Sequence, residues 1–296
     1  MMNQSQQRQQ QQQKEQQKEQ HAHLTITNLL QSRTPFFIGR IAGIELQTVY
    51  NLLHDNMHEV QHNVVELDNN AGIHVTSHTS LLHYADKLLE SYSHCTHIAE
   101  WEETGPVFAI TGKSQRMIQA RTPTIPKLPA RTLEPYYVQD SWMSAIKGKR
   151  VLIVHPFVHT LQQQQTKLAA VFPGRSWFEE CTLTFVAPPM TLAGHHEGRD
   201  WQERYNACIT ELQQHTAHDV ALVAAGGYGM LLSSYLYQQG MSVMYVGGAL
   251  QLFFGVIGKR WFDNKEVMAL VTDDWIRPTK EDAVENCVRV EKGCYW

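Results

Sequence analysis

Apolar runs alternate with segments of helical periodicity along most of this chain. The runs at residues 36–41, 97–101, 150–154, 183–186, 220–225 and 243–246 predict buried strands. The segments between them place apolar residues three and four apart, which predicts helices over 26–31, 44–54, 79–91, 159–172, 200–215 and 230–239. Thr76 or Ser77 is the expected cap of the third helix. This alternation predicts an α/β fold, a Rossmann-like and mainly parallel sheet with helices on both faces.

Two segments depart from the pattern. Residues 1–22 are a Gln-rich tail with almost no apolar positions, so we predict that it is disordered. It is either a dispensable extension or an interaction or aggregation segment. Residues 122–135 hold four prolines and predict a linker. The expected organisation is a single α/β domain over 23–296, with a cleft between halves at about 23–125 and 126–296.

Composition narrows the class of protein. The 296 residues are 43% hydrophobic and 18% charged with a net charge of −4, an ordinary globular balance that does not favour a nucleic-acid partner. Five scattered cysteines without a CxxC spacing indicate reduced thiols. The N-terminus has no apolar secretory segment, and glycines divide the apolar stretch 220–237 into a strand, a turn and a helix. We therefore expect a cytoplasmic protein without a membrane span.

Glycine-rich turns follow two predicted strands. The turn at 226–229 ends a buried strand and opens a helix, an arrangement that exposes backbone amides to a phosphate. The alternative is a tight turn that only needs glycine backbone angles. A second glycine pair follows the next strand, so both turns are expected at one rim of the sheet. The candidate ligand-binding residues in these turns are Gly226, Gly227, Tyr228, Gly229, Gly247 and Gly248.

Charged and imidazole side chains are predicted near the same rim. Arg40 and Glu45 flank the junction between the first strand and its helix, where Glu45 is either functional or a partner of the helix dipole. His155 ends the strand 150–154 and is either an acid/base group or a structural histidine. Lys259 and Arg260 are either phosphate contacts or solvated cations.

Three further features carry weaker signals. Asn69 and Asn70 lie in a predicted turn and are candidates to hydrogen-bond a ligand. His195, His196 and Asp200 suggest metal ligands, but adjacent histidines flanked by glycine are more often a plain loop. The sequence contains no GxSxG, Walker A or HExxH motif, which removes the main support for hydrolase, P-loop and zinc-protease functions.

Taken together, the motifs resemble a group of mostly uncharacterised proteins found near polysaccharide-biosynthesis genes and similar to the GT-D glycosyltransferase fold. The resemblance covers about residues 35–296. Its motifs are FIGRIAGIE at 37–45, NNAG at 69–72, LEPYY at 133–137, GKRVLIVHPF at 148–157, GGYGM at 226–230, GGALQLFFG at 247–255, GKRW at 258–261 and CYW at 294–296.

This resemblance implies transfer of a sugar from a nucleoside diphosphate sugar to a glycan or other hydroxyl acceptor. The resemblance carries over Glu45; on this interpretation Glu45 or His155 is the catalytic group that acts on the acceptor, and Gln251 joins the substrate-binding residues. In GT-D enzymes an Asp-x-Glu motif holds Mn²⁺ or Mg²⁺; here Gly43 replaces the Asp, so Glu45 is the remaining candidate ligand. Cationic side chains are then expected to neutralise the leaving diphosphate. The alternatives are a non-catalytic nucleotide- or glycan-binding protein and a different Rossmann-type enzyme.

Overall fold

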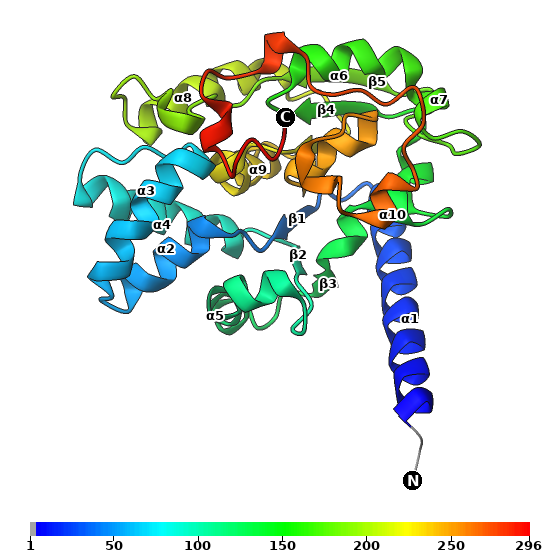
Figure 1. Cartoon of the computed structure of the whole chain (residues 1–296), viewed down its shortest axis with the longest axis horizontal. Coiled ribbons are helices and arrows are strands. Elements are labelled where there is room, and N and C mark those ends of the chain that lie inside the picture. The colour runs from blue at the N-terminus through cyan, green and yellow to red at the C-terminus, as the bar shows by residue number, and fades with distance from the viewer. Residues whose placement is uncertain (1–3) are drawn as a thin grey trace.

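The fold is built on one parallel sheet. The computed structural model describes the backbone of residues 4–296 and the side chains from residue 13 onward. Within this part of the chain, seven strands pair in the order β3-β2-β1-β7-β6-β4-β5, and every pair is parallel, which confirms the predicted α/β fold (Figure 1). The strands are β1 (Phe37–Arg40), β2 (His97–Glu100), β3 (Lys127–Pro129), β4 (Arg150–Val154), β5 (Thr182–Val186), β6 (Val220–Val223) and β7 (Ser242–Tyr245).

Helices cover both faces of the sheet. One face packs against α2 (Ile44–Leu53), α3 (Met57–Ala71), α4 (His78–Ser93), α5 (Pro106–Arg121), α8 (Trp201–Leu212) and α9 (Gly229–Gln238). The other packs against α1 (Gln4–Gln31), α6 (Val158–Gln164), α7 (Leu168–Val171), α10 (Lys265–Met268) and the 3₁₀ helix η8 (Gly248–Phe254). In β4, Val151 and Ile153 face one core while Leu152 and Val154 face the other. Both faces are therefore apolar, which explains the continuous apolar runs.

The connections leave neighbouring strands toward opposite faces. The chain after β1 enters α2 on one face, whereas the chain after β7 enters η8 on the other. β6 and β4 repeat this divergence, with α9 and α6 on opposite faces. Such divergence opens a crevice at the carboxyl ends of parallel strands, where ligands of this fold class bind.

The N-terminal segment corrects one prediction. Residues 4–22 belong to helix α1, where the sequence predicts a disordered tail; residues 1–3 lie outside the described residues. Gln, Lys and Glu are good helix formers. The helix is anchored at its C-terminal part, where Ala22, Ile26 and Leu30 recur every four residues and are buried. Its N-terminal part extends away from the body (Figure 1).

Other segments also differ from the prediction. The expected linker at 122–135 contains β3, an edge strand that ends at Pro129, a place where a sheet tolerates proline. The expected turn at 69–72 is the end of α3, closed by Gly72 with φ 72°. Helices α3 and α5 are absent from the prediction because few of their residues are apolar and buried.

In the described residues, no helix is both long and apolar enough to cross a membrane.

Candidate functional site

A cavity of about 730 Å³ lies at the carboxyl ends of four neighbouring strands. Its walls combine residues that follow each strand with residues near the C-terminus of the chain. The lining includes Ile41–Glu45 after β1, Gly247–Ala249 after β7, Ala224 and Gly226 after β6, His155–Phe157 after β4, and Glu291, Tyr295 and Trp296. The structure thus brings several of the predicted ligand-binding residues together around one cavity.

Arg40 is held in the cavity wall by its surroundings. Its Nη1 donates a 2.6 Å hydrogen bond to the carbonyl of Val246, and its guanidinium lies 5.0 Å from the centre of the Trp101 ring and 6.0 Å from that of Tyr245. Its Nε is buried and makes no hydrogen bond to the described part of the protein. A fixed guanidinium with a spare donor and aromatic neighbours suits recognition of an anion.

The glycine pair after β7 makes room for side chains. A Cβ on Gly247 would lie 2.5 Å from Nη2 of Arg40, and a Cβ on Gly248 would lie 2.4 Å from the Tyr295 ring. Gly247 also has a φ of 74°, which favours glycine. The pair therefore seats Arg40 and Tyr295 in the wall, in addition to lining the cavity itself.

The turn at 226–229 is largely packed against protein. Gly226 lines the cavity, but Gly227 and Gly229 do not. A Cβ on Gly227 would lie 2.3 Å from the Ile73 side chain, and one on Gly229 would lie 2.1 Å from the Tyr245 ring. Tyr228 is buried, at 1% exposure. These contacts match the alternative of a tight turn more closely than an open phosphate loop.

Two tyrosine hydroxyl groups donate hydrogen bonds to this turn. The hydroxyl of Tyr84 donates to the carbonyl of Gly227 at 2.9 Å, and that of Tyr245 donates to the carbonyl of Gly226 at 3.1 Å. Both carbonyls therefore accept hydrogen bonds from protein side chains, and only Gly226 of this turn lines the cavity.

Glu45 lies in the first turn of α2 and is buried, at 8% exposure. Burial raises the pKa of its carboxyl group above the ordinary value, and hydrogen bonding to backbone and the charge of Arg40 oppose this shift only in part. A Cβ on Gly43 would lie 4.0 Å from Oε2 of Glu45, so the two positions of the Asp-x-Glu spacing are adjacent in space. Glu45 lacks the second carboxylate that an Asp at position 43 would supply.

His155 lines the cavity and is only 2% exposed as a residue. Burial lowers its pKa to about 3, which keeps the ring neutral at physiological pH. Its Nδ1 accepts a 2.9 Å hydrogen bond from the backbone N–H of Phe157. The ring proton therefore sits on Nε2, and His155 is a hydrogen-bond donor through that atom.

The C-terminal segment forms one wall of the cavity. Arg260 donates from Nη1 to the Tyr295 hydroxyl at 2.8 Å and from Nη2 to the carboxylate of Glu291. Burial disfavours the charged form of Arg260, but Tyr295 and Glu291 outweigh it and raise the pKa of the guanidinium. Burial also raises the pKa of Tyr295 to about 12. Lys259 is exposed and does not line the cavity.

The three predicted amide residues have different surroundings. Asn70 lines the cavity, whereas Asn69 donates to its neighbour's side chain at 2.8 Å and to the carbonyl of Arg289 at 2.8 Å. Gln251 is fully buried and donates to the carbonyls of Val256 and Tyr295, at 3.1 and 3.3 Å. Its Oε1 is buried without a partner in the described residues.

Most of the aromatic lining of the cavity was not predicted from the sequence. Trp101, Tyr245 and Trp296 line the cavity, although none was singled out as a site residue. Trp101 is the last residue of one predicted strand and Tyr245 the next to last of another, so their positions at the carboxyl rim were available as a signal. The terminal Cys-Tyr-Trp motif pointed to Trp296 but not to its place in the wall.

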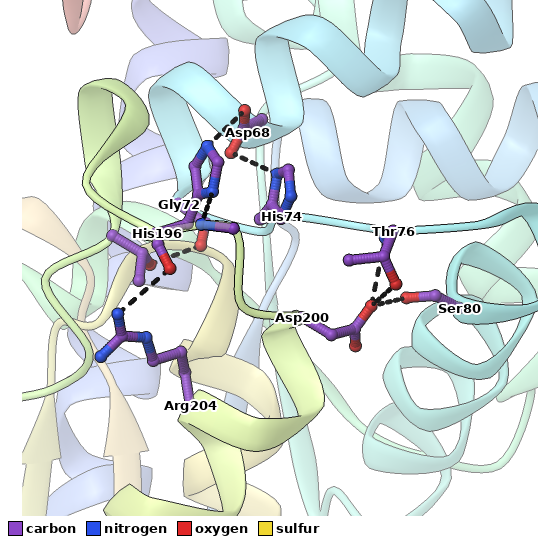
Figure 2. Close-up of polar contacts among 10 residues, drawn as sticks. Asp68, Gly72, His74, Thr76, Ser80, His196, Asp200 and Arg204 are labelled. Carbon is purple, nitrogen blue, oxygen red and sulfur yellow. Dashed lines mark hydrogen bonds and ion pairs between the residues drawn. The ribbon is translucent and has the colours of Figure 1, made fainter.

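His195 and His196, in the loop before α8, have different partners. His195 bonds through Nε2 to the carbonyl of Glu285 at 2.7 Å, and Asp200 caps α8 and accepts from Thr76 and Ser80. His196 instead lies next to Asp68 and His74, two residues that were not predicted as ligands from the sequence (Figure 2).

Comparison of the chain with protein families, characterised proteins and solved structures finds no match.

Proposed function

We propose that this protein is a glycosyltransferase that binds a nucleoside diphosphate sugar in the cavity and transfers the sugar to a hydroxyl of a glycan or another acceptor. The observation that supports this best is the cavity at the switch point of the parallel sheet, which joins a buried carboxyl group to two arginines and an aromatic lining. Its volume of about 730 Å³ is within the size range of small-molecule sites. The motif resemblance to GT-D proteins points the same way.

Donor recognition would rest on charge and stacking. Arg40 and Arg260 are the cations of the lining and suit a diphosphate, because guanidinium groups pair with phosphate oxygens. Trp101, Tyr245 and Tyr295 offer aromatic faces for a sugar or a base. Arg260 already pairs with Glu291, so a donor would compete with this carboxylate.

Glu45 is the proposed general base. Its raised pKa makes the carboxylate a better proton acceptor than an ordinary one. It would take the proton of the acceptor hydroxyl while that oxygen bonds to the anomeric carbon. The bond between the anomeric carbon and the diphosphate oxygen breaks, and the nucleoside diphosphate leaves with the negative charge. His155 would donate a hydrogen bond from Nε2 to a hydroxyl of the bound sugar.

One observation favours a second candidate, a non-catalytic nucleotide- or glycan-binding protein. Glu45 has no paired carboxylate, because Gly43 occupies the other position of the Asp-x-Glu spacing. Mn²⁺ or Mg²⁺ would lose a ligand here, and stabilisation of the leaving diphosphate would fall to Arg40 and Arg260. Binding and transfer therefore need separate tests.

Donor binding is tested by calorimetry with a panel of nucleoside diphosphate sugars. We expect saturable binding of at least one donor, weakened about tenfold or more by Arg260→Gln, equivalent to roughly 1.4 kcal/mol. Lys259→Gln is the matched control, because Lys259 is the preceding residue and lies outside the cavity. No binding across the panel, or equal losses in both variants, would contradict the proposed site.

Transfer is tested with the donor that binds. Glu45→Gln keeps the shape of the side chain, so we expect donor affinity to change little while the transfer rate falls on the order of 10²–10⁴-fold. Binding without transfer by the wild-type protein would support the binding protein instead. Equal transfer rates for wild type and Glu45→Gln would remove Glu45 from the mechanism.

A further inference from the structure

A second cluster of ligand-type side chains lies outside the cavity. Asp68 comes from the last turn of α3, His74 follows that helix, and His196 belongs to the loop between β5 and α8. His74 Nδ1 lies 3.5 Å from Asp68 Oδ1, and His196 Nε2 lies 3.7 Å from Asp68 Oδ2. One ligand atom from each residue lies within 4.8 Å of the other two (Figure 2).

These separations do not fit hydrogen bonds. A nitrogen-to-oxygen hydrogen bond is about 2.7–3.2 Å long, so both contacts with Asp68 are too long. Asp68 Oδ1 is buried and has no hydrogen-bond partner among the described residues. Two ligands at about 2.0–2.1 Å from a tetrahedral Zn²⁺ stand roughly 3.3 Å apart. The two His-to-Asp separations, 3.5 and 3.7 Å to different oxygens of the carboxylate, are close to this value.

Hydrogen bonds to backbone carbonyls hold His74 and His196 in place. The carbonyl of His74 accepts from the N–H of Trp201 at 2.8 Å, and that of His196 accepts from Arg204 at 3.1 Å. Thr191 donates to the carbonyl of Gly72 at 2.5 Å and thereby ties the loop before α8 to the end of α3. The cluster therefore joins two segments far apart in the sequence that are already cross-linked.

We propose that Asp68, His74 and His196 bind a divalent transition-metal ion, with Zn²⁺ as the reference ion. Two imidazoles and a carboxylate are a donor set that suits such ions, and three protein ligands leave a position for water or another ligand. The ion would tie the loop before α8 to α3. Asn70 is two residues from Asp68 and Leu192 four residues from His196, and both line the cavity, so the ion would brace one of its walls.

Binding requires two local changes. His196 Nδ1 accepts a 3.0 Å hydrogen bond from Gly198 N–H, so the ring proton must move from Nε2 to Nδ1 and this bond must break. The rings of His74 and His196 stack at 3.5 Å with planes 6° apart, and they must tilt to aim both nitrogens at one ion. Glu197 and Gly198 are exposed, and both have positive φ angles, 54° and 70°. The rearrangement therefore falls on a surface turn.

The test is Zn²⁺ titration of untagged, full-length protein, by calorimetry and by thermal unfolding. We expect one tight site per chain and a higher melting temperature with Zn²⁺, because an ion that binds the folded state stabilises it. His196→Ala and Asp68→Asn should each weaken this site by about tenfold or more. Co²⁺ should give visible absorption bands that the same two variants abolish.

Two control variants assign the site. His195→Ala removes the neighbouring histidine of the same loop, whose ring bonds to Glu285. His62→Ala removes one member of the exposed pair His58 and His62, which are one turn apart on α3 and could chelate Zn²⁺ on the surface. Both controls should keep the tight site. Loss of binding in His62→Ala but not in His196→Ala would overturn the proposal, as would the absence of a saturable site in the wild type.

Discussion

Glu45 and His155 are two ionisable residues of the cavity wall that burial drives toward their neutral forms. Their pKa values move in opposite directions, upward for the carboxyl group and downward to about 3 for the imidazole. Burial disfavours charge of either sign, which accounts for both shifts. The carboxyl group becomes a stronger base and the imidazole a fixed donor. Each therefore costs folding free energy in a particular range of pH.

Glu45→Gln should stabilise the protein at neutral and alkaline pH. Because folding raises the pKa of Glu45, its contribution to stability is present below the unfolded pKa of about 4.5 and is lost as pH rises through the folded pKa. The variant removes that loss, so its advantage should be largest above the folded pKa and vanish toward pH 4.5. Denaturant unfolding at several pH values measures it. Glu66→Gln, at an exposed position of the same rim, is the control. A less stable Glu45→Gln variant at pH 8 would show that the buried carboxylate does not destabilise the fold.

At the residue scale, the sequence placed Arg40, Glu45 and His155 correctly at one rim. Each lies at or just beyond the end of a buried apolar run, and parallel strands carry their carboxyl ends to a common edge. The role of Gly247, which leaves space for the guanidinium of Arg40, could not be predicted from the sequence. Its Cα faces the Arg40 guanidinium from 207 residues away in the sequence, a contact that no local pattern encodes. Tyr245 was taken as part of a strand because its apolar ring fits that pattern.

At the scale of elements, helix α1 shows how a polar segment is ordered by the segment that follows it. Its buried residues lie in the C-terminal part, and Glu19 forms an ion pair with Arg131 at 3.4 Å. Isolated helices of this composition are marginal in water. The packing of Ala22, Ile26 and Leu30 supplies the nucleus from which the helix extends toward its N-terminus.

This division within α1 predicts unequal effects of two changes. Ile26 is completely buried, so Ile26→Ala should cost about 2–5 kcal/mol and lower the melting temperature by several degrees. Leu24→Ala is the matched control, because Leu24 is 56% exposed, and it should cost less than about 0.5 kcal/mol. Deletion of residues 2–14 should change the free energy of unfolding as little as Leu24→Ala does. A large loss on this deletion would mean that the polar part of α1 packs on the fold.

Helix α3 marks the limit of local patterns. Val60, Leu67 and Ala71 are its buried apolar residues, and the buried Asn63 accepts a 2.7 Å hydrogen bond from Asn51. Asn63 interrupts the helical spacing of apolar residues along α3. Its burial could not be predicted locally, because its hydrogen-bond partner Asn51 belongs to α2. The same helix supplies Asp68 to the proposed metal site. His196 was noticed in the sequence, but its partners were not, since long-range packing alone brings them together.

At the scale of the whole molecule, two buried histidines should make the fold sensitive to acid. His23 in α1 is 4% exposed, and neither of its ring nitrogens has a hydrogen-bond partner in the described residues. Burial lowers the pKa of His23 to about 4 and that of His155 to about 3. Between these values and the unfolded pKa of about 6.5, the unfolded chain binds more protons than the folded one. Stability should therefore fall as the pH drops through this window, opposite to the effect of Glu45.

His23→Leu should remove part of this acid sensitivity. A shift from about 6.5 to about 4 corresponds to a loss on the order of 3 kcal/mol between pH 7 and pH 4. Leu fills a similar volume without titrating, so the variant should be at least as stable at pH 7 and clearly more stable at pH 4.5. His21→Leu, two residues away and exposed, is the control and should follow the wild-type curve. Urea unfolding at half-unit pH steps measures the difference, and parallel curves for wild type and His23→Leu would show that His23 is not buried in its neutral form.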